Sequence, residues 1–286
     1  MKEYHILSLS GGKDSTALAF YIRDNLPEIH EKIEYLFADT EKEIPETYDY
    51  LNKIEIFLGK PIKRLKPSHS FDHLYQMYNM LPSVNNRWCT VHLKTKTFRH
   101  YVYQKVKNDT DARVFLYIGI RADEAQRVKS STSGDNYINE VFPFVDNGIN
   151  KSDVTKILND AGIGYPDYYK WRKRSGCYFC MFQSKMDWIN LYENHPDLFQ
   201  KAMDYEFNDC EEIKIGRFGW NVDMPLKDII KPENMAKIKE NYAKLQERYR
   251  KKLKEKSPEK IIDMYSEDFE IEEEECEENN CPFCHS

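Results

Sequence analysis

The sequence predicts an α/β fold in which helices cover a parallel sheet, and three observations support this class. The chain opens with an apolar, strand-like run that breaks at two glycines into a helix-forming run. Further apolar runs then alternate with helical segments, which is typical of parallel strands joined by crossover helices. Finally, three of the strand-like runs end in clusters of polar residues, where doubly wound sheets bind ligands.

The first element extends from Tyr4 to Ile22 and is typical of a strand, a tight turn and a helix. Its turn is Ser10-Gly11-Gly12, between an apolar strand and the helical run 16–22. Adjacent glycines can adopt torsions closed to other residues and leave N–H groups accessible at the positive end of the helix. The pattern therefore favours a phosphate-binding loop over an ordinary glycine turn.

The side chains of this loop support the same interpretation. Lys13 adds a positive charge, and Ser10 and Ser15 add hydroxyl donors. Asp14 brings a negative charge to an anion site, so we expect it to cap the helix or to help hold a magnesium ion. The loop is not the Walker type, which has four residues between its first glycine and its Gly-Lys pair.

The later elements extend the alternation of strands and helices. Strands are predicted over 33–38, 61–65 and 113–120, and helices over 44–57, 71–80 and the second half of 87–106. The first and last of these strands end in Asp39-Thr40 and in Arg121 to Glu124. Because parallel strands end at the same edge of a sheet, both clusters should converge with the glycine loop on one crevice.

Charge and hydropathy restrict the classes of function. The net charge is −6, but residues 266–286 carry nine acidic residues and no lysine or arginine, which leaves +3 for the rest of the chain. A mildly basic chain outside this acidic tail is compatible with a polyanionic partner but does not by itself indicate one. No apolar run is long enough to span a bilayer, and the N-terminus enters the first strand directly, so we expect a cytoplasmic protein without a membrane partner. The oligomeric state stays open.

The second half predicts helices, with a break at Pro196 between residues 185 and 206 and a charged helix over 231–259. We expect a nucleotide-binding α/β domain at 1–165, a CxxC-containing helical subdomain at 166–230, and a charged helix with an acidic tail at 231–286. The stretch 165–174 interleaves four aromatic with four basic residues. It is either a site for nucleic acid or a packed loop with a solvated basic edge.

Seven cysteines, an odd number, favour thiolate chemistry or metal binding over a disulfide framework. Cys177 and Cys180 form one CxxC pair, and Cys281 and Cys284 form another. The two pairs could together bind zinc, although the gap between them is unusually long. The alternatives are another kind of metal centre and thiols that bind no metal.

The segment Ser10 to Ser15, SGGKDS, is identified as the signature of the N-type ATP pyrophosphatases. Five later segments resemble, in order, motifs of the phosphoadenylylsulfate (PAPS) reductase family, and the likeness covers about residues 4–226. These segments are FADTEKEIPETYDYL (37–51), RWCTVHLK (87–94), GIRADEAQR (119–127), FPFVDNGINKSDVTKIL (142–158) and SGCYFC (175–180). The intact loop is most similar to members that consume ATP, such as the DndC type of DNA phosphorothioation.

This resemblance implies a Rossmann-like parallel sheet of about five strands, of the adenine nucleotide alpha hydrolase type. It also implies that the nucleotide lies near Asp39 and Thr40, and that Arg121 and Arg127 serve its phosphates or a bound oxyanion. The candidate ATP-binding residues are Ser10, Gly11, Gly12, Lys13, Asp14, Ser15, Asp39, Thr40, Gly119, Arg121 and Arg127. The candidate catalytic residues are Lys13, Asp14 and Arg121.

The resemblance also implies a 4Fe-4S cluster. In the sulfate-reducing relatives, the motif that matches 87–94 has two adjacent cysteines, whereas here Trp88 replaces one of them. Cys89, Cys177 and Cys180 would then hold the cluster, and its fourth iron would be open or capped by Cys281 or Cys284. Zinc bound by the two CxxC pairs is the alternative.

The function implied is adenylation of a substrate by ATP, with release of pyrophosphate, as a step in sulfur transfer. The acceptor would be a nucleic acid or a small molecule, and a sulfur-donor protein is a further partner that this reaction would use. Two alternatives remain. One is a thiol-dependent reductase of PAPS or adenylylsulfate with Cys281 or Cys284 as nucleophile, and the other is a non-catalytic nucleotide-binding subunit of a larger assembly.

Overall fold

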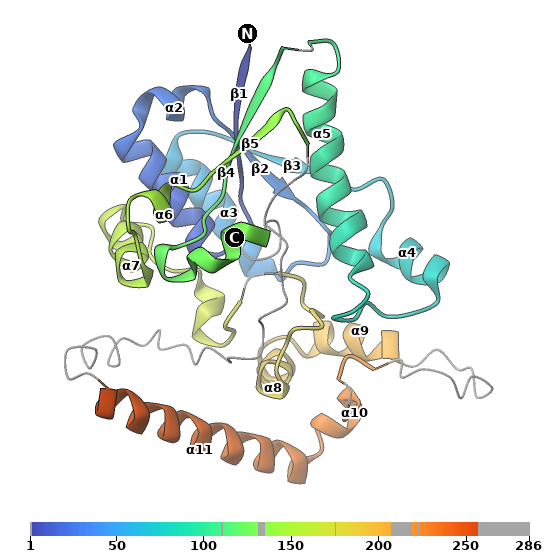
Figure 1. The fold of residues 1–286 in the computed structure, drawn as a ribbon. Helices are drawn as coiled ribbons and strands as arrows, with labels where there is room; N and C mark the ends of the chain where they lie inside the picture. Colours follow the sequence, from blue (N-terminus) through green and yellow to red (C-terminus); the bar gives the residue numbers. More distant parts are fainter. Residues whose placement is uncertain are drawn as a thin grey trace. The chain divides into compact units, whose positions relative to one another are not determined.

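The structure is a computed structural model, and it describes residues 2–109, 111–130, 135–174, 176–206, 219–221 and 223–256 (Figure 1). Within these ranges the chain forms two compact units. The first comprises residues 2–74 and 88–167, and the second comprises residues 75–87 and the described residues from 168 onward. In the described part of the chain, no helix has the length and apolar character needed to cross a membrane.

The first unit contains a five-stranded sheet in the order β3-β2-β1-β4-β5, in which all neighbouring strands are parallel (Figure 1). Its strands are β1 (Glu3–Ser8), β2 (Glu34–Ala38), β3 (Ile62–Leu65), β4 (Arg113–Tyr117) and β5 (Ile138–Val141). This sheet confirms the predicted fold class. Since the chain proceeds outward from β1 to β3 and then returns to place β4 beside β1, the strand order reverses there, which is where such sheets bind ligands.

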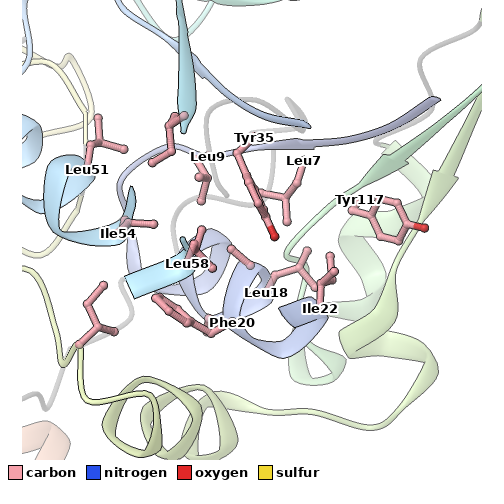
Figure 2. Close-up of a cluster of buried hydrophobic side chains, with 14 of the residues drawn as sticks. Leu7, Leu9, Leu18, Phe20, Ile22, Tyr35, Leu51, Ile54, Leu58 and Tyr117 are labelled. Carbon is pink, nitrogen blue, oxygen red and sulfur yellow. The ribbon is translucent and has the colours of Figure 1, made fainter. Parts of the chain in front are cut away.

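Helices cover both faces of the sheet, because the alternate residues of its strands are apolar on both sides. On one face, Leu7, Tyr35 and Phe37 pack against α1 (Lys13–Asn25), α3 (Pro45–Leu58) and α7 (Lys151–Asp160), and Figure 2 shows part of this cluster. On the other face, Ile6, Leu36 and Leu116 pack against α5 (Lys96–Val106). The two cores hold the carboxyl ends of the strands in a fixed register.

Shorter elements connect these helices and strands. They are α2 (Pro27–Lys32), α4 (Phe71–Tyr78), the π-helix η1 (Thr90–Thr95), the 3-10 segment η2 (Ala122–Ser130), α6 (Pro143–Asp146) and η3 (Asp167–Lys170). Helix α7 begins with a capping box, in which the Asn150 side chain accepts hydrogen bonds from Ser152 N and Asp153 N. Helix α3 ends at Gly59, which is left-handed and terminates the helix.

The second unit is helical and contains α8 (Lys185–Asn194), α9 (Pro196–Glu206), α10 (Leu226–Ile229) and α11 (Pro232–Lys256). The predicted break at Pro196 and the long charged helix are confirmed. Trp188 and Phe199 are buried and lie edge to face, with ring centroids 6.4 Å apart. The buried Glu206 carboxylate accepts hydrogen bonds from Trp220 N and Leu226 N at 2.8 and 2.7 Å, which joins α9 to α10.

Candidate functional site

The glycine loop joins β1 to α1 at the carboxyl end of the central strand. Gly11 has φ +76°, and a Cβ on it would lie 3.0 Å from Thr47 Cγ2. Both the torsion and the close approach exclude a larger residue. Gly12 is the N-cap of α1, and the first α1 backbone hydrogen bond runs from Thr16 N to Gly12 O at 3.1 Å. The loop therefore ends at the positive pole of a 13-residue helix.

The serine hydroxyls hold the shape of this loop. Ser10 N–H donates to Ser15 Oγ and Gly12 N–H donates to Ser10 Oγ, both at 3.2 Å. Ser15 Oγ donates in turn to Gly12 O at 3.2 Å, and Thr16 Oγ1 donates to the same carbonyl at 2.8 Å. These hydrogen bonds preorganise the loop, and the long ones can exchange for an incoming phosphate oxygen.

Lys13 and Asp14 occupy the first turn of α1, and Lys13 is only 5% exposed. The expectation that Asp14 caps the helix is wrong, because the N-cap is Gly12 and no side chain caps it. Asp14 Oδ1 instead accepts a hydrogen bond from Arg121 Nη1 at 3.0 Å. The negative charge in the loop is thus neutralised by a distant arginine.

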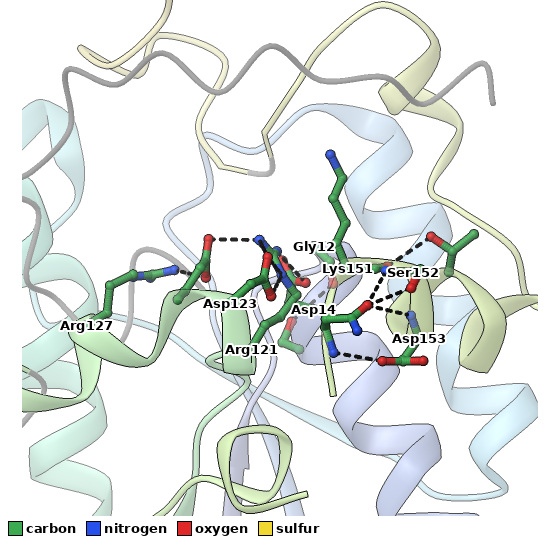
Figure 3. A network of polar contacts seen from close by, with 12 residues as sticks. Gly12, Asp14, Arg121, Asp123, Arg127, Lys151, Ser152 and Asp153 are labelled. Carbon is green, nitrogen blue, oxygen red and sulfur yellow. Dashed lines mark hydrogen bonds and ion pairs between the residues drawn. The ribbon is translucent and has the colours of Figure 1, made fainter. Parts of the chain in front are cut away.

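Arg121 is the centre of a charged network at the end of β4 (Figure 3). Arg121 is 4% exposed, and its guanidinium contacts three carboxylates, those of Asp14, Asp123 and Glu124, at 3.0 to 3.1 Å. Burial alone would lower the pKa of Arg121, but the carboxylates, Asp14 foremost, raise it above its usual value. Arg121 is therefore a permanent cation, held in one orientation.

Glu124 links Arg121 and Arg127, for which the family resemblance implies contact with the phosphates or a bound oxyanion. Its Oε1 accepts from Arg121 Nη2 at 3.0 Å, and its Oε2 accepts from Arg127 Nη1 at 2.5 Å. Glu124 was predicted to lie in the polar cluster at 121–124 but was not predicted to have a role. Its place between two arginines in the GIRADEAQR segment is the sequence feature that could have predicted this linking role.

Gly119 brings the end of β4 against the glycine loop. A Cβ at this position would lie 3.1 Å from Asp14 O and 3.3 Å from Ser15 Cα. The structure thus gives Gly119 a packing role next to the predicted nucleotide site. The start of α7 lies nearby, because Ala122 N–H donates to Ile149 O at 2.8 Å. The position of the α7 N-terminus near this site was not predicted, although the 142–158 segment contains the capping pattern that starts the helix.

Asp39 and Thr40 follow β2 at the same edge of the sheet, and both are buried. Asp39 Oδ1 accepts from Tyr48 Oη at 2.8 Å and from Glu41 N at 2.9 Å. Thr40 Oγ1 donates to Glu43 Oε1 at 3.0 Å. Since β1, β2 and β4 are parallel neighbours, the three predicted polar clusters lie at one edge of the sheet.

The described cysteines are half-buried thiols that belong to different units. Cys89 immediately precedes the π-helix η1, a type of element frequent at functional sites, and the adjacent Trp88 packs on Phe71 in the first unit. Cys177 and Cys180 form a tight turn in the second unit, with Cys180 N–H donating to Cys177 O at 3.2 Å. Cys281 and Cys284 lie outside the described residues.

No three His, Cys, Asp or Glu side chains gather to form a metal site within the described ranges. The assignment of Cys89, Cys177, Cys180, Cys281 and Cys284 to one metal therefore stays a prediction. The aromatic and basic stretch 165–174 is partly a packed loop, because Tyr168 and Arg172 are 0% and 3% exposed. These two side chains are inaccessible to a nucleic acid.

Comparisons with known proteins identify the family to which this chain is similar. The family described as "Phosphoadenosine phosphosulfate reductase domain" matches residues 4–181. An uncharacterized protein of Methanocaldococcus jannaschii, MJ0973, is 28% identical over 250 residues, which cover 84% of this chain but only 56% of that protein. The chain thus spans just over half the length of this relative.

Two solved structures are more distant. A phosphoadenylyl-sulfate (PAPS) reductase from Candida auris, in a phosphate complex, has a TM-score of 0.46 and 15% identity, covering 63% of this chain and 83% of that chain. The U34-tRNA thiolase NcsA of Methanococcus maripaludis, with its [4Fe-4S] cluster, has a TM-score of 0.40 and 17% identity, covering 80% of each chain. From the match over residues 4–181, this chain belongs to the phosphoadenosine phosphosulfate reductase domain family.

Proposed function

We propose that this protein is an ATP pyrophosphatase that adenylates a substrate for sulfur transfer. The observation that carries the proposal is the loop SGGKDS at the N-terminus of α1, with Gly11 left-handed and Lys13 in the first helical turn. Such a loop can bind the β and γ phosphates of ATP through backbone N–H groups, the helix dipole and one ammonium group. Family membership supports nucleotide binding and sulfur chemistry.

In this reaction a substrate oxygen attacks the α phosphorus of ATP in line with the leaving group. The bond from the α phosphorus to the bridging oxygen breaks, and its electron pair leaves with pyrophosphate. Lys13, the loop N–H groups and a magnesium ion that arrives with ATP would stabilise the charge on the leaving group. Arg121 would stabilise the α phosphate, at the point where strand order reverses.

The ion pair between Asp14 and Arg121 suggests how the site accepts both ATP and magnesium. A carboxylate that contacts magnesium would weaken its contact with Arg121, and Nη1 of the guanidinium would then donate to the α phosphate instead. Asp123 and Glu124 keep Arg121 charged and in place during this exchange. Asp14 is therefore proposed as the residue that orients magnesium.

The thiols of Cys177 and Cys180 fit part of a metal site, because CxxC on a tight turn presents two sulfurs to one ion. We propose that they hold a 4Fe-4S cluster, with Cys89 and either Cys281 or Cys284 as further ligands, and with zinc as the alternative. When bound, the cluster would supply an iron that can carry sulfur. A sulfur-donor protein and a nucleic acid acceptor belong to the same proposal.

A second candidate is reduction of PAPS or adenylylsulfate by a thiol, and the description of the matched family favours it. The two reactions leave different products. ATP labelled at the α phosphate should yield labelled AMP or an adenylated acceptor together with pyrophosphate, whereas ADP as the product would contradict the proposal. Sulfite released from PAPS without ATP would establish the reductase instead.

The variant Lys13→Ala tests the loop in the same assay. We expect pyrophosphate release to fall by about 100-fold, because one preorganised cation is lost at the leaving group. The control is Lys156→Ala, an exposed lysine on α7, which should release pyrophosphate at the rate of the unaltered protein. Equal rates for both variants would remove the loop from the mechanism.

A further inference from the structure

The CxxC turn of the second unit is held by a buried arginine. Arg172 Nη1 donates to Gly176 O at 3.0 Å, and Arg172 Nη2 donates to Cys177 O at 2.6 Å. Gly176 has φ +126°, a torsion that only glycine adopts readily, so the chain turns sharply just before the first cysteine. The two arms of one guanidinium thus fix consecutive carbonyls at the entry to the turn.

The charge of Arg172 is not neutralised by any carboxylate in the described part of the chain. The side chain is 3% exposed, its two hydrogen-bond partners are carbonyl oxygens, and its Nε is buried without a partner among the residues described. A buried cation of this kind is costly unless a negative charge lies near it. Cys177, whose carbonyl the guanidinium contacts, would supply this charge as a metal-bound thiolate.

Further hydrogen bonds hold the backbone of the rest of the CxxC turn. Cys180 O accepts from Gln183 N at 3.0 Å, and Gln183 Nε2 donates to Tyr178 O at 2.7 Å. With the hydrogen bond from Cys180 N to Cys177 O, the backbone between the two sulfurs is held from both ends. Arg172 is the charged member of this set.

We infer that Arg172 is a positioning residue for a thiolate-bound metal at Cys177 and Cys180, whose charge its guanidinium compensates and whose turn it holds in place. The inference rests on the proposed metal centre. The proposed role of Arg172 is to position the thiolates and not to take part in adenylation. The metal content and the absorption spectrum therefore test this role directly. Mutation of a residue that orients metal ligands through hydrogen bonds typically lowers metal affinity by about 10-fold to 100-fold.

The experiment compares the full chain with Arg172→Gln and Arg172→Lys after anaerobic purification. Iron and zinc per chain and the absorption spectrum are measured for each protein. Arg174→Gln is the matched control, because Arg174 is an exposed arginine two residues away. Circular dichroism and ATP binding, which depends on the first unit, show whether each variant is folded.

We expect Arg172→Gln to fold and bind ATP but to bind metal at least about 10-fold more weakly, with an altered absorption spectrum. Arg172→Lys should recover part of the metal content, because lysine restores the charge but not the two-armed hydrogen bonding. The control should match the unaltered protein. Full metal content and an unchanged spectrum in Arg172→Gln would overturn the inference while leaving the proposed centre intact.

A different result would identify failure of the proposed centre itself. If the unaltered protein holds neither iron nor zinc, and Cys177→Ser changes nothing, no metal centre exists at this turn and the inference falls with it. Loss of metal in both Arg172→Gln and Arg174→Gln would also overturn it. That outcome would show that loss of positive charge near the turn, and not the contacts of Arg172, lowers the metal content.

Discussion

Asp14 and Arg121 are 107 positions apart in the chain, yet a carboxylate oxygen of one lies 3.0 Å from a guanidinium nitrogen of the other. This ion pair connects the first turn of α1 to the end of β4. It places the charged groups of two motifs on opposite sides of the point where strand order reverses. The proposed adenylation depends on this ion pair, because it sets the positions of Asp14 and Arg121.

Arg121→Met should lower the free energy of unfolding by about 3 kcal/mol, because it leaves the three carboxylates close together without their cation. Asp14→Asn should cost less, since Arg121 keeps Asp123 and Glu124. Urea unfolding of both variants and of the double variant measures the coupling between the two residues. Additive effects would show that the ion pair contributes nothing of its own.

Gly11→Ala should weaken ATP binding by at least about ten-fold, because the new Cβ meets Thr47 and the residue keeps a positive φ. Gly59→Ala is the matched control. Gly59 is also left-handed, with φ +66°, but nothing lies within 4 Å of its Cβ position. It should lose about 1 kcal/mol of stability and no ATP affinity. Equal ATP binding by both variants would contradict the role of the loop.

Gly119→Ala should have a related effect through a different contact. The added methyl would press on Asp14 O and Ser15 Cα, which are backbone atoms that cannot rotate away. We expect ATP affinity to fall while the helical second unit keeps its stability. Calorimetric titration with ATP measures the change, and an unaltered dissociation constant would show that β4 can shift away from the loop.

Stability should decrease as the pH falls through about 6.5, and His5 should contribute to the change. Burial lowers the pKa of His5, whose Nδ1 lies 3.0 Å from Tyr117 Oη and whose ring stacks on Phe115. A histidine with a lowered pKa in the folded state stabilises the protein above its unfolded pKa and loses that contribution as the pH falls.

The measurement is the free energy of unfolding at about pH 7.5 and at about pH 5.5. His5→Gln should show a smaller difference between the two conditions than the unaltered protein. His100→Gln, a change at an exposed position of α5, should leave the difference as it was. An undiminished difference in His5→Gln would assign the pH dependence to other groups.

Local patterns predicted most of the fold. The strand, glycine turn and helix of residues 4–22 and the break at Pro196 are encoded by neighbouring residues, and the structure confirms them. The convergence of residues 10–15, 39–40 and 121–124 followed from parallel pairing alone. Strand β5 was not recognised as an element, because it is a short edge strand with the polar residues Asn139 and Glu140 at its centre.

The contacts that sequence reasoning could not predict are long-range. Asp14 was expected to cap its own helix or to help hold magnesium, since nothing near it in sequence indicates an arginine at position 121. Arg172 looked like one of four basic residues in a surface stretch, and only the fold shows it buried against the CxxC turn. In both cases tertiary contacts decide what a charged side chain does.

The central claim is that the loop at residues 10–15 holds the phosphates of ATP. A crystal structure with magnesium and an ATP analogue that resists cleavage between its α and β phosphates tests this most directly. We predict that β and γ phosphate oxygens lie within hydrogen-bond distance of the loop N–H groups and of Lys13 Nζ. A nucleotide bound elsewhere, or a loop that contacts no phosphate, would contradict the account.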